Sequence, residues 1–165
     1  MAYVILGAAL FLSLTLEATL FTHLTLHGIK PDLLLVLVII FSLFRGSVPG
    51  AQLGFVYGLV EDLLLGNYIG LNAACKMLVG YVIGWIGKRF FKDNLLVPVL
   101  SVFTGTLGFL LLYLLLFSLV TGGSAWGAFS DMALPLCLYN TLLGLLLYRP
   151  LYRSLTEGIL RPERR

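Results

Sequence analysis

The most constraining feature of this sequence is a succession of long apolar runs, which short segments rich in polar residues, glycine or proline separate. A helix needs roughly 20 mostly apolar residues to cross the hydrocarbon core of a bilayer. We expect spanning helices at about residues 2–22, 32–44, 48–65, 71–87, 95–120 and 132–152. The sequence therefore predicts an all-α integral membrane protein, a six-helix transmembrane bundle that forms a single domain.

The composition supports a membrane environment. Of the 165 residues, 59% are hydrophobic and only 12% are charged, whereas soluble domains carry about 25% charged residues. This is too little charge to cover a globular surface in water, which excludes a soluble enzyme, a disordered chain and a secreted disulfide scaffold. The N-terminal run lacks a basic leader and an obvious cleavage site, so we expect a retained helix rather than a signal peptide.

The second run is shorter than the others. Its 13 residues rise only about 20 Å as a helix, at about 1.5 Å per residue. Three arrangements are open: a nearly upright helix in a thinned part of the bilayer, a helix that continues through Arg45, or a re-entrant hairpin with the third run.

The basic residues predict the orientation. With six spans and the N-terminus inside, nine of the eleven Lys and Arg residues fall in inner segments and only Lys30 falls in an outer connection. The nine are Arg45, Lys88, Arg89, Lys92, Arg149, Arg153, Arg161, Arg164 and Arg165. Because cytoplasmic loops carry an excess of Lys and Arg, we expect both termini in the cytoplasm.

Several polar residues lie within or beside the predicted spans. Ionisable groups are costly there and need a partner, a water-filled cavity or a function. The set comprises Glu17, Glu61, Asp62, Asn72, Lys76, Asp131 and Asn140. The predicted topology places the ionisable members in the outer half of the membrane, where Glu17 can reach the interface and Asp131 can cap a helix. A tight turn after the third span brings Lys76 within reach of Asp62 or Glu61.

Three interpretations of this polar cluster remain open. It can cancel charge and fix the register of two helices, or it can line a cavity or a partner-binding groove that opens outward. An ion pathway is the third, although polar groups are sparse in the inner half. For Asn140 we expect a hydrogen bond to a neighbouring helix.

Glycines recur at four-residue intervals along two predicted spans. They are Gly50, Gly54, Gly58 and Gly66 on the third span, and Gly80 and Gly84 on the fourth. Small residues at this spacing let helix backbones approach closely in lipid. The stripes therefore predict internal helix packing or a groove for the helix of another protein.

Motifs for catalysis, phosphate binding and metal binding are not found in the sequence. It contains no His-Glu-x-x-His, Gly-x-Ser-x-Gly or phosphate-loop pattern. His23 and His27 have metal-like spacing but no clear third ligand, and Cys75 and Cys137 are expected to be buried as small hydrophobic residues. We therefore expect neither an enzyme, a cofactor nor a metal site.

The region from Pro31 to Gly87 resembles MreD, the family of bacterial rod shape-determining membrane proteins. The matching pieces, in order, are Pro31-Asp32-Leu33, Arg45-Gly46, Gly50, Gly54, Gly58, Asp62-Leu63-Leu64, Gly66 and Gly70-Leu71-Asn72-Ala73. The rest agrees in length, in the number of spans and in a last helix with Pro135 and Asn140.

The resemblance implies a non-enzymatic, multi-pass scaffold or regulator in the bacterial inner membrane. MreD proteins act in peptidoglycan synthesis during elongation, bind MreC directly, and belong to a wider complex with RodA, a class B penicillin-binding transpeptidase and MreB. The family fold is similar to the S component of energy-coupling factor transporters. The alternative function is therefore a substrate-binding subunit of a vitamin transporter, with its ligand in an outward-facing cavity.

Overall fold

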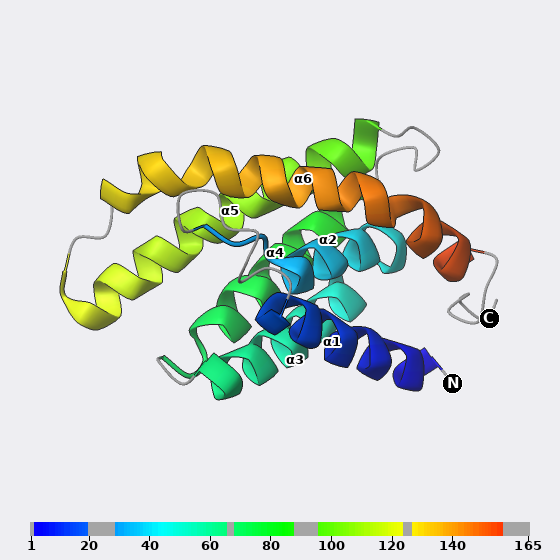
Figure 1. Ribbon diagram of the computed structural model, residues 1–165, viewed down its shortest axis with the longest axis horizontal. Helices are drawn as coiled ribbons and strands as arrows, with labels where there is room; N and C mark the ends of the chain where they lie inside the picture. The colour runs from blue at the N-terminus through cyan, green and yellow to red at the C-terminus, as the bar shows by residue number, and fades with distance from the viewer. Residues whose placement is uncertain (1, 20–28, 66–67, 88–95, 124–126, 157–165) are drawn as a thin grey trace.

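A computed structural model of the chain describes residues 2–19, 29–65, 68–87, 96–123 and 127–156. Six helices make up the regular structure of these residues. They are α1 (Ala2–Thr19), α2 (Leu33–Arg45), α3 (Ser47–Leu65), α4 (Leu71–Gly87), α5 (Leu96–Thr121) and α6 (Gly127–Thr156). The all-helical fold agrees with the prediction, and α6 begins five residues before its expected start. Figure 1 shows that α1 begins and α6 ends at the same end of the bundle.

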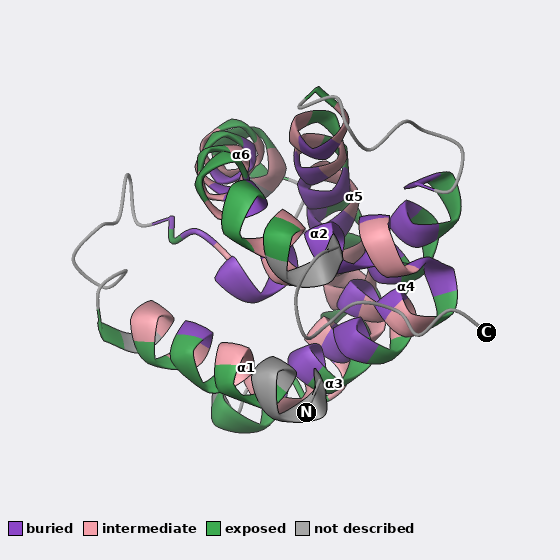
Figure 2. Ribbon diagram, turned by 90° about the vertical axis from the view of Figure 1, so that its right-hand side faces the viewer, coloured by how far each residue is buried: buried purple, intermediate pink, exposed green. Residues whose placement is uncertain are grey.

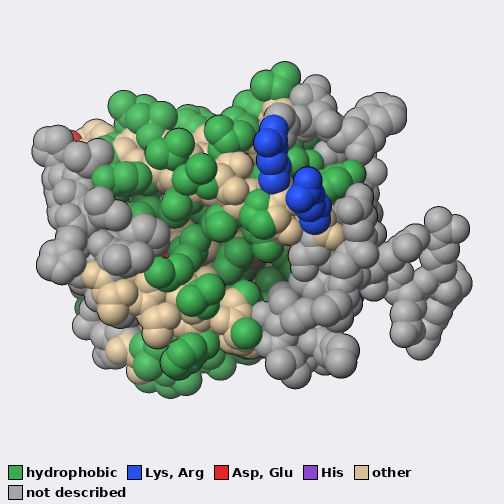
Figure 3. All heavy atoms as spheres, turned by 45° about the vertical axis from the view of Figure 1, so that its right-hand side comes forward, with side chains coloured by type: hydrophobic (Ala, Val, Ile, Leu, Met, Phe, Trp, Pro, Cys, Tyr) green, Lys and Arg blue, Asp and Glu red, His purple; other side chains and the backbone are tan. Residues whose placement is uncertain are grey.

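Two helices are long and apolar enough to cross a membrane by themselves, among the residues that the structure describes. They cover Leu96–Thr121 and Phe129–Arg153, and shorter apolar helices cover Gly7–Glu17, Leu33–Arg45 and Leu71–Gly87. Hydrophobic side chains also cover much of the described surface seen in Figure 3, where Lys and Arg side chains lie close together to the right of the centre. Such a surface suits contact with lipid better than contact with water.

The short helix α2 is the centre of the bundle (Figure 2) and contacts each of the other five helices. Ten of its residues are buried, and Leu34, Leu35, Val36, Val38, Ile39 and Ile40 have no exposed surface. A helix that is hydrophobic on all sides belongs in such a position. The helix formed by this run includes Arg45 and is 13 residues long, as short as the sequence predicts.

A single residue, Gly46, separates α2 from α3. Its φ of 95° lies in the left-handed region that glycine adopts without strain. The Gly46 N–H donates to the carbonyl oxygen of Ser42 at 2.8 Å, which ends α2 with a satisfied carbonyl. The chain can then reverse and begin α3 at Ser47.

Helices α3 and α4 form the most extensive contact between two helices of the bundle. A Cβ atom added at Gly54 would meet the backbone of Lys76, and one at Gly58 would lie 2.6 Å from the Cα of Ala73. From the other side, a Cβ at Gly80 would lie 2.5 Å from the carbonyl oxygen of Gly50. Gly50, Gly54, Gly58, Gly80 and Gly84 therefore let two backbones touch within the chain. No partner helix can reach these glycines in this arrangement.

Helix α1 lies at the margin of the bundle. Leu10 and Leu14 pack on a buried cluster formed by α2 and α3, while Phe11 and Leu12 are 70% and 60% exposed. The contact between α1 and the rest of the bundle is mainly to α2. The last turns of α1 nevertheless carry a residue of the polar site.

Candidate functional site

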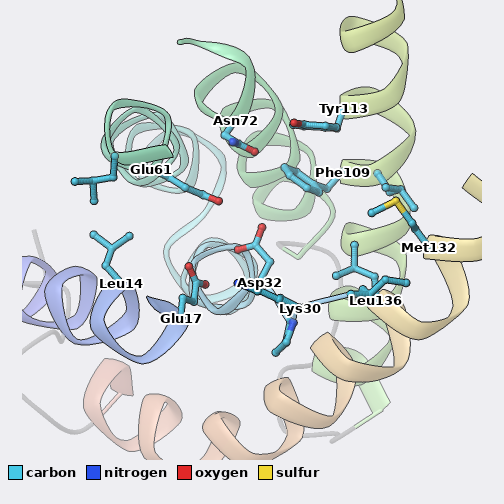
Figure 4. Close-up of a pocket in the computed structure, with 14 residues that line it drawn as sticks. Leu14, Glu17, Lys30, Asp32, Glu61, Asn72, Phe109, Tyr113, Met132 and Leu136 are labelled. Carbon is cyan, nitrogen blue, oxygen red and sulfur yellow. The ribbon is translucent and has the colours of Figure 1, made fainter. Parts of the chain in front are cut away.

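A cavity of about 630 Å³ lies at the N-terminal end of α2. Because α2 is short, it leaves space at that end of the bundle, and the walls come from the other five helices and from residues 29–32, which precede α2 (Figure 4). The lining residues are Leu14, Glu17, Ile29, Lys30, Pro31, Asp32, Glu61, Leu64, Asn72, Phe109, Leu110, Tyr113, Met132 and Leu136. The walls are largely apolar, with three carboxylates along one side.

Lys76 of α4 is fully buried beside this cavity and pairs with two carboxylates. Its Nζ donates to Oδ1 of Asp32 at 2.9 Å and to Oε2 of Glu61. The same nitrogen lies 5.7 Å from the ring centroid of Phe109, a distance at which a cation and an aromatic face attract each other. A buried ammonium is tolerated only when it is paired and hydrogen-bonded, and Lys76 meets both conditions.

The sequence left Asp62 or Glu61 open as the partner of Lys76, and the structure forms the pair with Glu61. Asp62 instead accepts hydrogen bonds at the start of α4. Its donors are the N–H groups of Gly70, Asn72 and Ala73, at 2.9, 3.2 and 3.1 Å, and the side-chain Nδ2 of Asn72 at 2.9 Å. Asp62 thus caps a helix from the preceding one. The alternative prediction, an ion pair between Lys76 and Asp62, is therefore wrong.

Two carboxylates from different helices cap the N-terminus of α2. Oδ1 of Asp32 accepts from the N–H of Leu35 at 2.7 Å, the usual bond of an N-cap residue. Oε1 of Glu17 accepts from the N–H groups of Leu33 and Leu34 at 2.6 and 3.2 Å. These bonds satisfy three backbone donors that the first turn leaves unpaired, and negative charge is favourable at this end of a helix.

Glu17 therefore points into the bundle rather than toward the membrane interface, contrary to the expectation. The donors at the buried start of α2 explain this orientation. This carboxylate is the main polar connection between α1 and the rest of the described chain.

Asn140 connects α6 to the same site. Its Oδ1 accepts from the N–H of Asp32 at 2.9 Å, and its Nδ2 donates to Oγ1 of Thr106 at 3.2 Å. Both Asn140 and Thr106 are fully buried. The expected bond from Asn140 to a neighbouring helix is present, and it joins α5 and α6 to the start of α2.

Asp131 does not belong to the cluster. Helix α6 begins at Gly127, so Asp131 lies in its second turn rather than at its start. It is exposed and accepts a weak hydrogen bond from Ser130 at 3.4 Å. Gly66, His23 and His27 lie outside the described residues. Cys75 and Cys137 are buried free thiols, as expected.

Sequence reasoning did not single out Asp32, Phe109 or Tyr113 as residues of the site. Asp32 entered only as part of a family motif, although an aspartate directly before an apolar run is a typical N-cap. Phe109 and Tyr113 face the cavity from α5 (Figure 4), but nothing in their local sequence distinguishes them from packing residues. Among the described residues, no group of three or more His, Cys, Asp or Glu side chains is placed to hold a metal ion.

Comparison with known proteins gives one family. Residues 1–156 match the family described as rod shape-determining protein MreD. Neither the curated proteins nor the solved structures contain a significant match, so the likeness to transporter S components remains an expectation. The family match covers nearly the whole chain and includes every element of the fold. The chain therefore belongs to the MreD family of rod shape-determining membrane proteins.

Proposed function

We propose that this protein is a non-enzymatic scaffold or regulator of the cell-wall elongation machinery, and that it binds MreC directly. RodA, a class B penicillin-binding transpeptidase and MreB belong to the wider complex. The observation that carries the proposal is the family match over residues 1–156. The proposed location is the bacterial inner membrane, which the chain crosses several times with both termini in the cytoplasm.

The packing of α3 against α4 limits where MreC can bind. A docking site at the glycine stripes would require these two helices to separate, because their backbones already touch there. MreC must then contact an exposed face. Candidates are α1 with Leu12, α3 with Val56, and α6 with Leu142, which are 60%, 50% and 56% exposed.

Helix association in lipid depends on close packing rather than on removal of apolar surface from water. A bulky side chain in the middle of a docking face therefore disrupts binding, whereas the same side chain on a lipid-facing surface is tolerated. Leu12→Trp, Val56→Trp and Leu142→Trp place the same obstacle on three different faces. None of the three original side chains is buried.

The proposal is tested by co-purification of MreC with each variant after extraction in a mild detergent. We expect the unmodified chain to retain MreC and one of the three variants to lose most of it, at equal expression and with an unchanged melting temperature. If the unmodified chain retains no MreC, direct binding is wrong; if all three variants retain it fully, docking on these faces of α1, α3 and α6 is wrong.

The cavity at the N-terminus of α2 supports a second candidate, a substrate-binding subunit of a small-molecule transporter. Its supporting features are a volume of about 630 Å³ and a mixed polar and apolar lining. This candidate predicts uptake of a small molecule that depends on a cytosolic energising module. Membranes that contain the chain but show no such uptake, together with intact MreC binding, would favour the first proposal.

A further inference from the structure

The cavity has the dimensions of a small-molecule site. Pockets for small ligands typically occupy about 300–1,000 Å³ and combine apolar walls with a few placed polar groups. This cavity, at about 630 Å³, is within that range. It is far larger than a water site, because one water molecule occupies about 30 Å³ in the liquid. A ligand rather than a few waters fits this space.

One wall of the cavity presents carboxylate oxygens that the described part of the chain leaves without hydrogen bonds. Each of Glu17, Asp32 and Glu61 uses one oxygen for the bonds described above. The second oxygen of each accepts no hydrogen bond from the described part of the chain. Figure 4 shows the three side chains directed toward a common space from α1, the start of α2 and α3.

Among the described residues, acidic side chains are more numerous than basic ones along the walls of the cavity. Three carboxylates face one buried ammonium, Lys76, which lies behind Asp32 and Glu61 and is not part of the lining. The N-terminus of α2 contributes only about half a positive charge. Lys30 is exposed at the rim, where its charge is screened. In the part of the chain that the structure describes, the carboxylates around the cavity thus outnumber the ammonium that pairs with them, which favours a cationic ligand.

The opposite wall is aromatic and apolar. Phe109 and Tyr113 line it together with Leu110, Met132 and Leu136. Aromatic faces attract cations, and Phe109 already lies within that range of the Lys76 ammonium. Apolar side chains beside them suit a ligand with a hydrocarbon body.

We propose that this cavity binds a ligand that carries an ammonium group on an apolar body. The ammonium lies among Glu17, Asp32 and Glu61, and the body lies against Phe109, Tyr113 and the aliphatic wall. Two sources share this chemistry, a free organic amine and the headgroup of an amine-bearing lipid. The proposal rests on the cavity alone and does not depend on MreC binding.

The first test is a calorimetric titration of the purified full-length protein in an uncharged maltoside detergent. The probes are 2-phenylethylamine, 2-phenylethanol and 3-phenylpropionate at neutral pH, which share an aromatic body and differ in charge. We expect saturable binding of the amine, and binding of the alcohol and the carboxylate at least tenfold weaker. Equal binding of the amine and the alcohol, or preference for the carboxylate, overturns the proposal.

The second test assigns binding to the cavity. Glu17→Gln removes one negative charge but keeps an oxygen that can accept from Leu33 and Leu34, and it leaves the Lys76 pairs intact. We expect amine affinity to fall about tenfold, the size of one lost charged contact, with a small decrease in melting temperature from the loss of charge at the start of α2. Asp131→Asn is the matched control, because Asp131 is an exposed acid that does not line the cavity, and it should bind as the unmodified chain does. Equal amine affinity in Glu17→Gln and the unmodified chain contradicts the assignment.

A third arm distinguishes the two sources of the ligand. The titration is repeated in nanodiscs with phosphatidylethanolamine and in nanodiscs with phosphatidylglycerol only. Competition by phosphatidylethanolamine identifies a lipid headgroup as the source, and unchanged amine affinity identifies a free amine. Loss of amine binding in both lipid environments overturns the proposal. Co-purification of MreC is unaffected by any of these outcomes, so failure here is distinct from failure of the proposed function.

Discussion

At the scale of single residues, the scarce charges of this chain hold helix ends together. Lys76 joins α4 to the start of α2 and to α3, while Glu17 and Asp62 cap helices other than their own. Glu61 and Asp62 are neighbours in the sequence but point about 100° apart on a helix. Only one of them can face Lys76, and the other is free to cap α4.

A double-mutant cycle tests the assignment of the Lys76 partners. Lys76→Ala leaves two buried carboxylates without their cation, so we expect a loss of about 3–5 kcal/mol in the free energy of unfolding. Adding Glu61→Ala should cost less than the sum of the single effects, with a coupling of about 1–3 kcal/mol. The control pair, Lys76→Ala with Asp62→Ala, should be additive within about 0.5 kcal/mol. Reversible unfolding in mixed micelles measures each value, and strong coupling to Asp62 alone would overturn the assignment.

The role of Asp62 as a cap makes a separate prediction. Asp62→Ala removes the acceptor for four hydrogen bonds at the start of α4. We expect a loss of about 1–3 kcal/mol, the range for a capping or charged hydrogen bond, and faster amide exchange at residues 70–73. Asp62→Asn keeps one acceptor and should lose less. Unchanged exchange in Asp62→Ala would show that this cap contributes nothing.

How far the sequence predicts the site depends on the distance between partners along the chain. The tight turn between α3 and α4 predicts that Lys76 pairs with Glu61 or Asp62, but it does not predict which of the two carboxylates forms the pair. Asp32 lies 44 residues from Lys76 and 108 from Asn140. Those contacts depend on the position of α2 among the other helices, and the sequence near these residues does not predict that position.

At the scale of elements, the central position of α2 and the close contact of α3 with α4 define the bundle. The apolar runs predict the ends of α2, α3, α4 and α5 to within one residue, because glycine, proline or charged residues mark them. Helix α6 starts at Gly127, earlier than expected. The polar residues Ser130 and Asp131 do not end the helix, because both lie exposed within its first turns. The glycine pattern predicted close packing but could not distinguish an internal contact from an external one.

Matched glycine substitutions test the contact between α3 and α4. A Cβ at Gly58 would lie 2.6 Å from backbone atoms of Ala73, so one of the helices must move. We expect Gly58→Ala to lower the free energy of unfolding by about 1–3 kcal/mol. Gly108→Ala in α5 is the control, because a Cβ there meets nothing within 4 Å. It should be neutral or stabilising by up to about 1 kcal/mol. Equal melting temperatures for the two variants would contradict the packing.

At the scale of the whole molecule, the helix bundle has a largely apolar surface, and its basic residues lie toward one end. The first residues of α1 and the last of α6 lie at the same end (Figure 1), as two termini on one side of a membrane require. The count of basic residues predicts that this end is cytoplasmic. The helices themselves do not report which end faces the cell interior.

Cysteine labelling in intact cells tests this orientation. Ser130 and Arg149 are both exposed and lie near opposite ends of α6. We expect Ser130→Cys to react with an impermeant maleimide added outside, and Arg149→Cys to react only after permeabilisation. The native thiols of Cys75 and Cys137 are buried and should remain unlabelled in both cases. The reverse pattern of labelling would invert the topology.

A measurement of cell shape is the most direct test of the proposed role in cell-wall elongation. A rod-shaped bacterium depleted of its own MreD receives this chain together with the MreC of the same source, and the ratio of cell length to width is measured. We expect cells to become round on depletion and the chain to restore rods. Cells that stay round, although the chain reaches the membrane in normal amounts with its MreC, would contradict this role.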